Sequence, residues 1–191
     1  MNQQPEKDRL VIVITGPSGV GKSSIVKQVR QRCDAGFSVS ATTRAPRPGE
    51  RDKVDYFFVD EDTFKRMVDG DEMLEWAEVF GCCYGTPAAQ VREAVERGEK
   101  IILDIDVQGG LQVARKIPDA RFILIVPPSM EVLKERLSGR GSETPEQMEK
   151  RLGQAESELR IARESGVYQN EIINDDLDAA IQRVVVAINQ E

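Results

Sequence analysis

Histidine is absent from the 191 residues of the chain. Mechanisms that need an imidazole base, a Ser-His-Asp triad or a histidine zinc ligand are therefore excluded. Cysteine is scarce as well. Cys33 and the adjacent pair Cys82 and Cys83 are too few and too badly spaced for a disulfide framework or a four-thiolate metal site. We therefore expect reduced thiols in a cytoplasmic protein.

Long apolar runs are also missing. No stretch approaches the roughly eighteen consecutive apolar residues that span a bilayer, and residues 1–9 are polar and charged. Basic residues are outnumbered 26 to 33, which leaves a formal net charge of −7. Such a charge argues against broad binding to nucleic acid or to an anionic membrane. An anionic ligand would have to be held locally, by a few side chains.

What the chain does contain is an alternation of strands and helices. Apolar runs at 10–15, 100–105 and 121–126 are typical of strands buried on both faces. Further strands are expected at 37–41, 56–59, 72–80 and 167–173. Helices are expected at 22–32, 61–69, 87–97, 109–116, 129–137, 145–165 and 177–188, with Thr86 and Thr144 as N-caps. The order predicts an open α/β sheet that binds ligands at the carboxyl ends of its strands.

Residues 16–23 (GPSGVGKS) fit the phosphate-loop pattern G-x-x-x-x-G-K-[ST], between a predicted strand and a predicted helix. Backbone N–H groups of such a loop turn toward phosphate oxygens, and the helix N-terminus adds partial positive charge. Lys22 would reach the β and γ phosphates, and the Ser23 hydroxyl would bind Mg²⁺. The alternative is a glycine turn with an incidental lysine. An N-K-x-D motif typical of GTPases is absent; Asn174-Asp175-Asp176 lacks the lysine.

A second anion site is suggested by residues 40–56, where Arg44, Arg47 and Arg51 accompany Tyr56 in an otherwise acidic protein. The guanidinium group of arginine binds phosphate through two parallel hydrogen bonds. The alternative is a solvated loop whose arginines pair with the neighbouring acids, Glu50, Asp52 and Asp55.

These motifs together resemble the guanylate kinase family. The phosphate loop, S-x-T-T-R-x-P-R-x-G-E at 40–50, L-E-W at 74–76, Y-G-T at 84–86 and L-D-I-D-V-Q-G at 103–109 follow that family's order and spacing. So do P-P-S at 127–129, residues 136–144 and I-N-D at 173–175. The resemblance covers residue 9 to the C-terminus. It implies ATP-dependent phosphorylation of GMP, and of dGMP, to the diphosphate with Mg²⁺, as part of purine nucleotide metabolism.

The resemblance also implies the architecture: a P-loop NTPase-type parallel sheet core flanked by helices, with an inserted mixed α+β GMP-binding lobe and a short lid. We expect a flexible tail at 1–9 and a single domain at 10–191. Its core comprises 10–39, 99–136 and 148–191, its lobe 40–98 and its lid 137–147.

Several site residues follow from the resemblance. The substrate GMP is expected to contact Ser40, Arg44, Arg47, Glu50, Tyr56, Glu75, Tyr84, Thr86, Asp104 and Asp106. Among these, the Glu75 carboxylate would accept from N1–H and the 2-amino group of guanine, whereas adenine has no donor at N1. Without the family pattern, Glu75 could be an acid on an exposed strand face.

ATP is expected on the phosphate loop (Gly16, Pro17, Ser18, Gly19, Val20, Gly21, Lys22 and Ser23) and on Arg136, Arg140, Asn174 and Asp175. Catalysis is assigned to Lys22, Arg47, Arg140 and Arg151, and Mg²⁺ to Ser23 and, through water, to Asp104. Alternatively, Asp104 and Asp106 cap the following helix, and Arg136, Arg140 and Arg151 form only surface ion pairs.

The chain departs from the family at Cys82 and Cys83, where asparagine and often tyrosine are usual, and at Lys53, which replaces a frequent glycine. Two rival functions remain open: a non-catalytic interaction module of the same fold, and a kinase for another nucleoside monophosphate. The expected partners are the small-molecule nucleotides ATP and GMP, with no nucleic acid and no membrane, for a monomer or small homo-oligomer.

Overall fold

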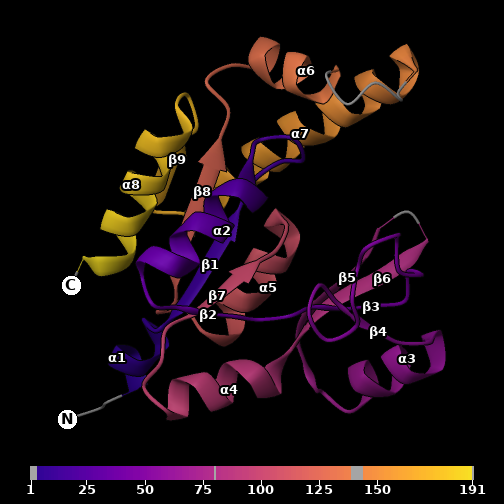
Figure 1. The fold of residues 1–191 in the computed structure, drawn as a ribbon, viewed down its shortest axis with the longest axis vertical. Helices are drawn as coiled ribbons and strands as arrows, with labels where there is room; N and C mark the ends of the chain where they lie inside the picture. The colour runs from indigo at the N-terminus through magenta and orange to yellow at the C-terminus, as the bar shows by residue number, and fades with distance from the viewer. Residues whose placement is uncertain (1–3, 80, 139–143, 191) are drawn as a thin grey trace.

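The computed structural model describes residues 4–79, 81–138 and 144–190, arranged as a sheet core and a smaller lobe beside it (Figure 1). The core sheet has five parallel strands in the order β2, β7, β1, β8, β9. Their bounds are Gly36–Phe37 (β2), Ile101–Asp104 (β7), Val11–Thr15 (β1), Arg121–Val126 (β8) and Asn170–Ile173 (β9). The predicted parallel crossovers and α/β core are confirmed.

The apolar run of β1 is explained by burial on both faces of this sheet. Ile12 and Ile14 contribute to one hydrophobic cluster, with α2 (Lys22–Arg32) and α8 (Leu177–Asn189). Val11 and Val13 contribute to the opposite cluster, with α4 (Ala88–Glu96) and α5 (Val107–Lys116). On that second face α7 (Pro145–Ser165) packs against β8, and α6 (Met130–Ser138) packs against α7. Strand β1 therefore lies at the centre of the core, and its carboxyl end leads into the phosphate loop.

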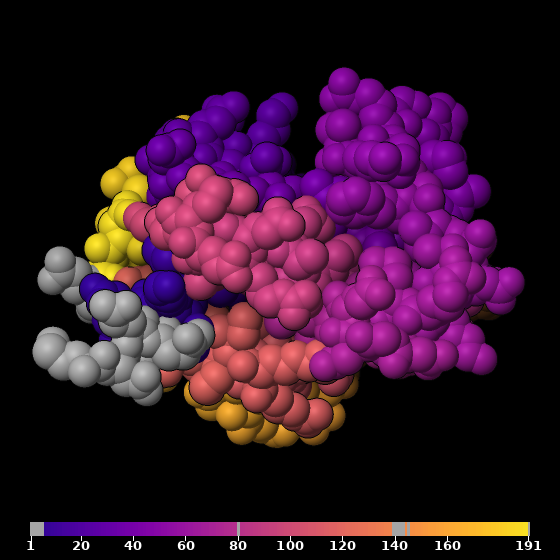
Figure 2. Space-filling view, turned by 90° about the horizontal axis from the view of Figure 1, so that it is seen from below, coloured from indigo at the N-terminus to yellow at the C-terminus, as the bar shows by residue number. Residues whose placement is uncertain are grey.

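The lobe has its own sheet, in the order β4, β3, β6, β5. The bounds are Ala41–Thr42 (β3), Phe57–Phe58 (β4), Met73–Val79 (β5) and Cys82–Pro87 (β6), with α3 at Glu61–Asp69. β3 and β4 are parallel, whereas β6 runs antiparallel to β3 and β5. Phe64 of α3 packs on Ala41 and Met73 beneath the sheet. In Figure 2 an open notch separates the lobe, in purple, from the indigo α2 side of the core.

Two local expectations were wrong, and one strand was not predicted. The single strand expected at 37–41 is two strands in two sheets, because the Ser38 N–H donates to Ile102 O in the core while Ser40 O accepts from Phe57 in the lobe. Thr86 does not cap a helix: β6 continues to Pro87, which is itself the N-cap of α4. β6 was not expected at all.

Several other boundaries differ slightly. α5 begins at Val107 rather than 109, because the Asp106 carboxylate accepts from Gly109 N and caps the helix there. The tail expected to be flexible includes a short helix, α1 (Gln4–Asp8). The capping box at Thr144 and Gln147 is confirmed. Among the described residues, none of the helices combines the length and apolar character needed to cross a bilayer.

Candidate functional site

The phosphate loop connects β1 to α2 and takes a conformation that requires glycine. Gly19 has a φ of 86° and Gly21 a φ of 95°, both in the left-handed region. A Cβ on Gly19 would lie 2.5 Å from Leu137 Cδ2, and one on Gly21 would lie 2.5 Å from Asn174 Nδ2. The glycines of the motif are thus needed both for the turn and for the close packing behind it.

The back of this loop is fixed by polar contacts from the end of β9 and from α6. Asn174, only 5% exposed, donates from Nδ2 to Val20 O at 2.7 Å. The Arg136 guanidinium donates to Asn174 O at 2.8 Å and to Val20 O at 3.4 Å. Asp175 takes no part in these contacts. It is exposed, and its carboxylate pairs with Arg183 at 3.1 Å. Two of the residues expected to bind ATP therefore contact the backbone of the loop itself.

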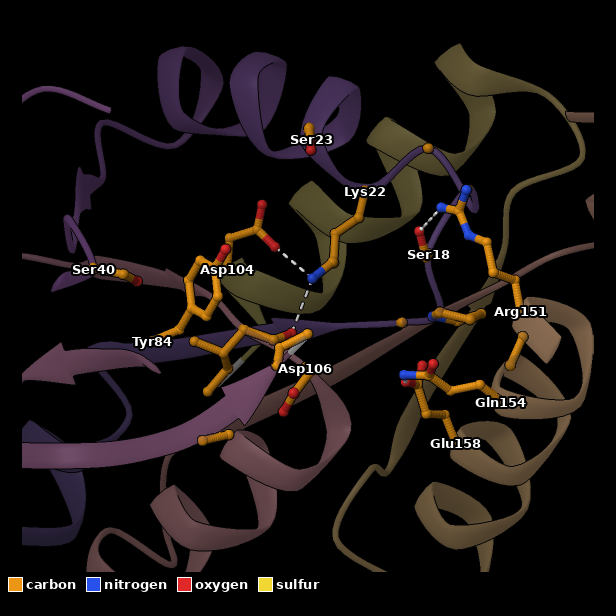
Figure 3. A pocket seen from close by; sticks show the side chains of 18 of the residues that line it. Ser18, Lys22, Ser23, Ser40, Tyr84, Asp104, Asp106, Arg151, Gln154 and Glu158 are labelled. Carbon is orange, nitrogen blue, oxygen red and sulfur yellow. Dashed lines mark hydrogen bonds and ion pairs between the residues drawn. The ribbon is translucent and has the colours of Figure 1, made fainter. Parts of the chain in front are cut away.

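Lys22, which follows β1 and the phosphate loop, contacts the carboxyl end of the neighbouring strand β7. Its Nζ lies 2.6 Å from Asp104 Oδ1 and donates to Ile105 O at 2.9 Å (Figure 3). Asp104 is the last residue of β7, which neighbours β1 in the sheet. The lysine is therefore held at the carboxyl edge of the sheet, beside the loop that precedes it. The alternative in which Asp104 serves as a helix cap is not realised, because Asp106 is the N-cap of α5.

One face of α7 forms the opposite wall. Arg151 Nη2 donates to Ser18 Oγ at 2.7 Å, and Gln154 Nε2 donates to Glu158 Oε1 at 2.9 Å. All three α7 side chains point toward the side of the cleft that holds Lys22 (Figure 3). Burial raises the pKa of Glu158, and the nearby charge of Lys22 opposes this shift.

The sequence reasoning identified only Arg151 on this face. The other polar α7 residues that line the cleft, Gln147, Lys150, Gln154 and Glu158, were not predicted to belong to the site. Positions 147, 151, 154 and 158 recur at helical spacing, so the signal was present in the sequence. It could have been found by extending the face from Arg151 along the predicted helix.

On the lobe side, Glu75 and Thr86 face each other across β5 and β6. The Thr86 hydroxyl donates to Glu75 Oε1 at 2.6 Å, and Glu75 is 6% exposed. The absence of a side chain on Gly109 leaves room for this carboxylate, since a Cβ there would lie 2.6 Å from Glu75 Oε2. Burial raises the pKa of Glu75 to about 7, with a smaller contribution from Asp106, while the hydrogen bond from Thr86 opposes the shift. Glu75 is thus a buried acid, not an acid on an exposed strand face.

The basic segment of the lobe forms a compact cluster with Glu50. Arg44 Nη2 lies 2.9 Å from Glu50 Oε1, and the Arg47 backbone N–H donates to Glu50 Oε2 at 2.7 Å. The Arg44 guanidinium lies 5.4 Å from the ring centroid of Tyr56, and the Tyr56 and Tyr84 rings are 6.0 Å apart. The hydrogen bond from Arg44 lowers the pKa of Glu50. The pairing with Glu50 that the solvated-loop alternative expects is therefore present.

A single cleft of about 970 Å³ brings most of these groups together. From the core it is lined by the phosphate loop, Lys22, Ser23, Asp104 and Asp106, and from the lobe by Ser40, Tyr56, Glu75 and Tyr84. The expected site residues that do not line it are Val20, which is buried in the core behind the loop, and Arg44, Arg47, Glu50, Thr86, Arg136, Asn174 and Asp175. Arg140 and the rest of 139–143, within the lid expected at 137–147, lie outside the described residues.

Comparisons with known proteins agree with one another. Residues 8–191 match the sequence model of the family described as guanylate kinase. A guanylate kinase of Thermus thermophilus is 46% identical over 181 residues, which cover 95% of this chain and 81% of that protein. The guanylate kinase of Synechocystis is 45% identical over 182 residues, covering 95% of this chain and 94% of that protein. A crystal structure of guanylate kinase from Anaplasma phagocytophilum superposes with a TM-score of 0.71 and 32% identity, covering 91% of this chain and 81% of that one.

Proposed function

The chain belongs to the guanylate kinase family, and we propose that it transfers the γ-phosphoryl group of ATP to GMP, yielding ADP and GDP, with dGMP as a second acceptor. The observation that carries this proposal is the single cleft, which is lined at one end by the phosphate loop and at the other by Ser40, Tyr56, Glu75 and Tyr84. Direct transfer between two nucleotides requires donor and acceptor sites that share one space.

Glu75 is proposed as the residue that selects the base. Its carboxylate would accept hydrogen bonds from N1–H and the 2-amino group of guanine, while the Ser40 hydroxyl would donate to O6. Thr86, expected from the resemblance to contact GMP, gives its one hydroxyl hydrogen to Glu75 and would act by holding that carboxylate. Adenine would leave the buried carboxylate without a donor, and an unpaired buried polar group costs on the order of 1–3 kcal/mol or more. Asp106 lies near enough to raise the pKa of Glu75 and lines the same end of the cleft, so it is proposed as a further contact to the base.

The phosphate of GMP is proposed to lie between the tyrosines Tyr56 and Tyr84 and the arginines Arg44 and Arg47. The tyrosines line the cleft, and Arg44 packs against the Tyr56 ring. Glu50 holds Arg44 by its side chain and Arg47 by its backbone, so it would set the position of both arginines.

The γ-phosphoryl group is proposed to pass between Lys22 and Arg151. Lys22 lies at the end of the phosphate loop, and Arg151 contacts Ser18 within it. Arg140 is proposed to join them as a lid arginine. Arg136 and Asn174 support the loop that carries ATP, and Asp175 remains a proposed adenine contact. The attacking oxygen belongs to a phosphate whose second pKa is about 6, so it is already anionic and needs no general base. Positioning and charge neutralisation then account for catalysis.

Magnesium is the metal ion expected for this reaction. It usually binds through one or two protein ligands together with phosphate oxygens and water. The described residues contain no group of three or more His, Cys, Asp or Glu side chains that could hold a metal ion alone. The hydroxyl of Ser23 and the carboxylate of Asp104, both lining the cleft, suit that sparse mode of binding. When bound, Mg²⁺ would neutralise charge on the phosphates.

We further propose a cytoplasmic role in purine nucleotide metabolism. Cys33, Cys82 and Cys83 are free thiols, as expected of a protein from a reducing compartment. Burial raises the pKa of Cys83, which leaves that thiol less reactive.

A coupled assay of ADP formation tests the function. We expect turnover with ATP and Mg²⁺ in the presence of GMP, slower or comparable turnover with dGMP, and little with AMP, CMP, UMP or dTMP. The absence of turnover with every acceptor would indicate a non-catalytic module. A preference for AMP or UMP would indicate a different nucleoside monophosphate kinase. Omitting Mg²⁺ is expected to abolish turnover.

A further inference from the structure

Two glutamines outside the cleft lining form the same contact with two different backbone segments. Gln112 of α5 accepts from Trp76 N at 3.2 Å and donates to Trp76 O at 2.8 Å. Gln90 of α4 accepts from Val39 N at 3.1 Å and donates to Val39 O at 2.8 Å. Each side-chain amide thus brackets the N–H and C=O of one residue. Both glutamines lie on helices that pack against the core sheet, including α4, which falls within the segment 40–98 expected as the lobe. Both bracketed residues lie at or near the lobe sheet.

The two hydrogen bonds between Gln112 and Trp76, here called the Gln112 bracket, take the place that a neighbouring strand would have at the edge of the sheet. β5 is the last strand of the lobe sheet, and within the part of the chain that the structure describes its strand partner is β6 alone. The outward backbone groups of an edge strand need another partner. A primary amide has donors and an acceptor close together, as a neighbouring peptide group would. Gln112 therefore joins the open edge of the lobe sheet to α5.

The Gln90 bracket holds the crossing between core and lobe. Just before Val39, Ser38 N makes the last hydrogen bond to the core sheet, to Ile102 O at 2.9 Å. Just after it, Ser40 O accepts the first hydrogen bond from the lobe, from Phe57 N at 2.9 Å. Val39 is therefore the residue at which the chain passes from one sheet to the other, and its bracket sets how the two parts meet.

The bracketed residues are the immediate neighbours of Ser40 and Glu75, the two cleft residues proposed to contact O6 and the N1–H and 2-amino edge of guanine. α5 constrains Glu75 a second time, because Gly109, one turn before Gln112, leaves the space that the Glu75 carboxylate fills. The same helix thus fixes the backbone beside Glu75 and the position of its side chain.

We propose that Gln112 and Gln90 are positioning residues for base selection: Gln112 sets Glu75 against the 2-amino edge of guanine, and Gln90 sets Ser40 against O6. This inference rests on the proposed function. Base specificity then depends on two side-chain amides that do not contact the nucleotide. They hold the lobe against the core so that Glu75 and Ser40 lie at the distance that guanine needs.

Inosine 5′-monophosphate separates the two roles, because it keeps O6 and N1–H but lacks the 2-amino group. Methionine is the replacement of choice, since it preserves the length of glutamine and removes both hydrogen bonds. Gln112→Met is expected to lower kcat/KM for GMP about tenfold or more, and for inosine monophosphate less, so that discrimination between them falls. Gln90→Met is expected to lower both values alike and to leave discrimination near that of the wild type. Gln182→Met, on the exposed face of α8, is the matched control.

Two measurements separate positioning from general loosening. The KM for ATP is expected to stay within about twofold of the wild-type value in both variants. Hydrogen exchange of the Trp76 amide is expected to accelerate in Gln112→Met, and that of the Val39 amide in Gln90→Met. Unchanged discrimination in Gln112→Met would overturn the inference, and so would parallel losses for ATP and GMP. If the wild-type chain does not phosphorylate GMP, the proposed function itself fails, and this is seen before any variant is made.

Discussion

The hydroxyl of Thr86 donates a 2.6 Å hydrogen bond to a carboxylate oxygen of Glu75, in a site where the acid is almost fully buried. A carboxylate can accept about four hydrogen bonds, so those from Thr86 leave it with acceptor capacity on the side of the cleft. A buried carboxylate that is only partly satisfied favours a ligand with donors of its own. Guanine offers two such donors side by side.

Glu75→Gln is expected to lower kcat/KM for GMP about 100-fold, because an amide cannot accept from both guanine donors and one of its own N–H groups would oppose them. The KM for ATP is expected to change little, since Glu75 lies at the lobe end of the cleft. Steady-state kinetics with each nucleotide varied in turn measures both effects. Equal losses for ATP and GMP would contradict the assigned role.

The pH dependence of stability provides a second test of Glu75. Its pKa in the folded protein is about 7, above its ordinary value of 4.5. The folded state therefore binds the proton more tightly than the unfolded state. The stabilisation is fully present below the ordinary pKa and is lost as the pH rises through about 7. The Tm of the wild type relative to that of Glu75→Gln is expected to fall between pH 5 and pH 8. Because the chain has no histidine, no imidazole titrates in that window. Parallel Tm curves would show that Glu75 is not a buried acid of this kind.

Arg151→Ala is expected to lower kcat about 100-fold while leaving GMP binding nearly unchanged, because a guanidinium beside the phosphate loop stabilises charge that develops during transfer. The control is Arg160→Ala on the same helix, since Arg160 is exposed and pairs with Glu164 at 3.8 Å. Single-turnover kinetics would separate the transfer step from product release. A normal transfer rate in Arg151→Ala would exclude the role.

Asn174→Ala is expected to destabilise the protein by about 1–3 kcal/mol, because Val20 O would lose a buried hydrogen bond. The KM for ATP should rise, since this bond supports the phosphate loop, while GMP binding measured without ATP should be retained. Asn189→Ala, near the end of α8, serves as the control, because it removes only exposed hydrogen bonds, with Lys100 and Val185 O, and these lie away from the phosphate loop. Denaturant unfolding and nucleotide titration would measure the two effects. A loss of GMP binding alone would contradict this account.

Lys53 occupies the position at which the family often has glycine, and its φ of 64° lies in the left-handed region. A side chain there costs about 1–2 kcal/mol, which is offset in part by the greater entropy of glycine in the unfolded chain. Lys53→Gly is therefore expected to raise the free energy of unfolding by roughly 0.5–1 kcal/mol. Lys65→Gly, within α3, should have the opposite effect, because glycine weakens a helix. Urea unfolding would compare them; a loss of stability in Lys53→Gly would contradict the strain argument.

The phosphate loop and the core sheet were predictable from the sequence because their signals are local. An apolar strand, a glycine motif and a helix follow one another without interruption in residues 10–32. The lobe was harder to predict. β3 and β4 have two residues each, too few to show a period, and β6 contains glycine and proline, which weigh against a strand. Pairing with β5 overrides that local preference.

The residues that line the cleft could be predicted only in part, because contacts between distant parts of the chain bring them together. The sequence shows that Gln154 and Glu158 share a helical face with Arg151, but only the folded chain places that face opposite Lys22. The brackets of Gln90 and Gln112 join residues distant in sequence and carry no local signal.

The order of strands in the core sheet has a consequence for synthesis of the protein. β1 lies between β7 and β8, so neither of its neighbours exists until the ribosome has passed Ile101 and then Arg121. The lobe, by contrast, forms its own sheet within residues 41–87 and can assemble first. Chains that end at residue 100 and have been released from the ribosome should therefore protect the lobe from protease and leave β1 open to cleavage. The phosphate loop, among the earliest segments to leave the ribosome, is one of the last to acquire its shape.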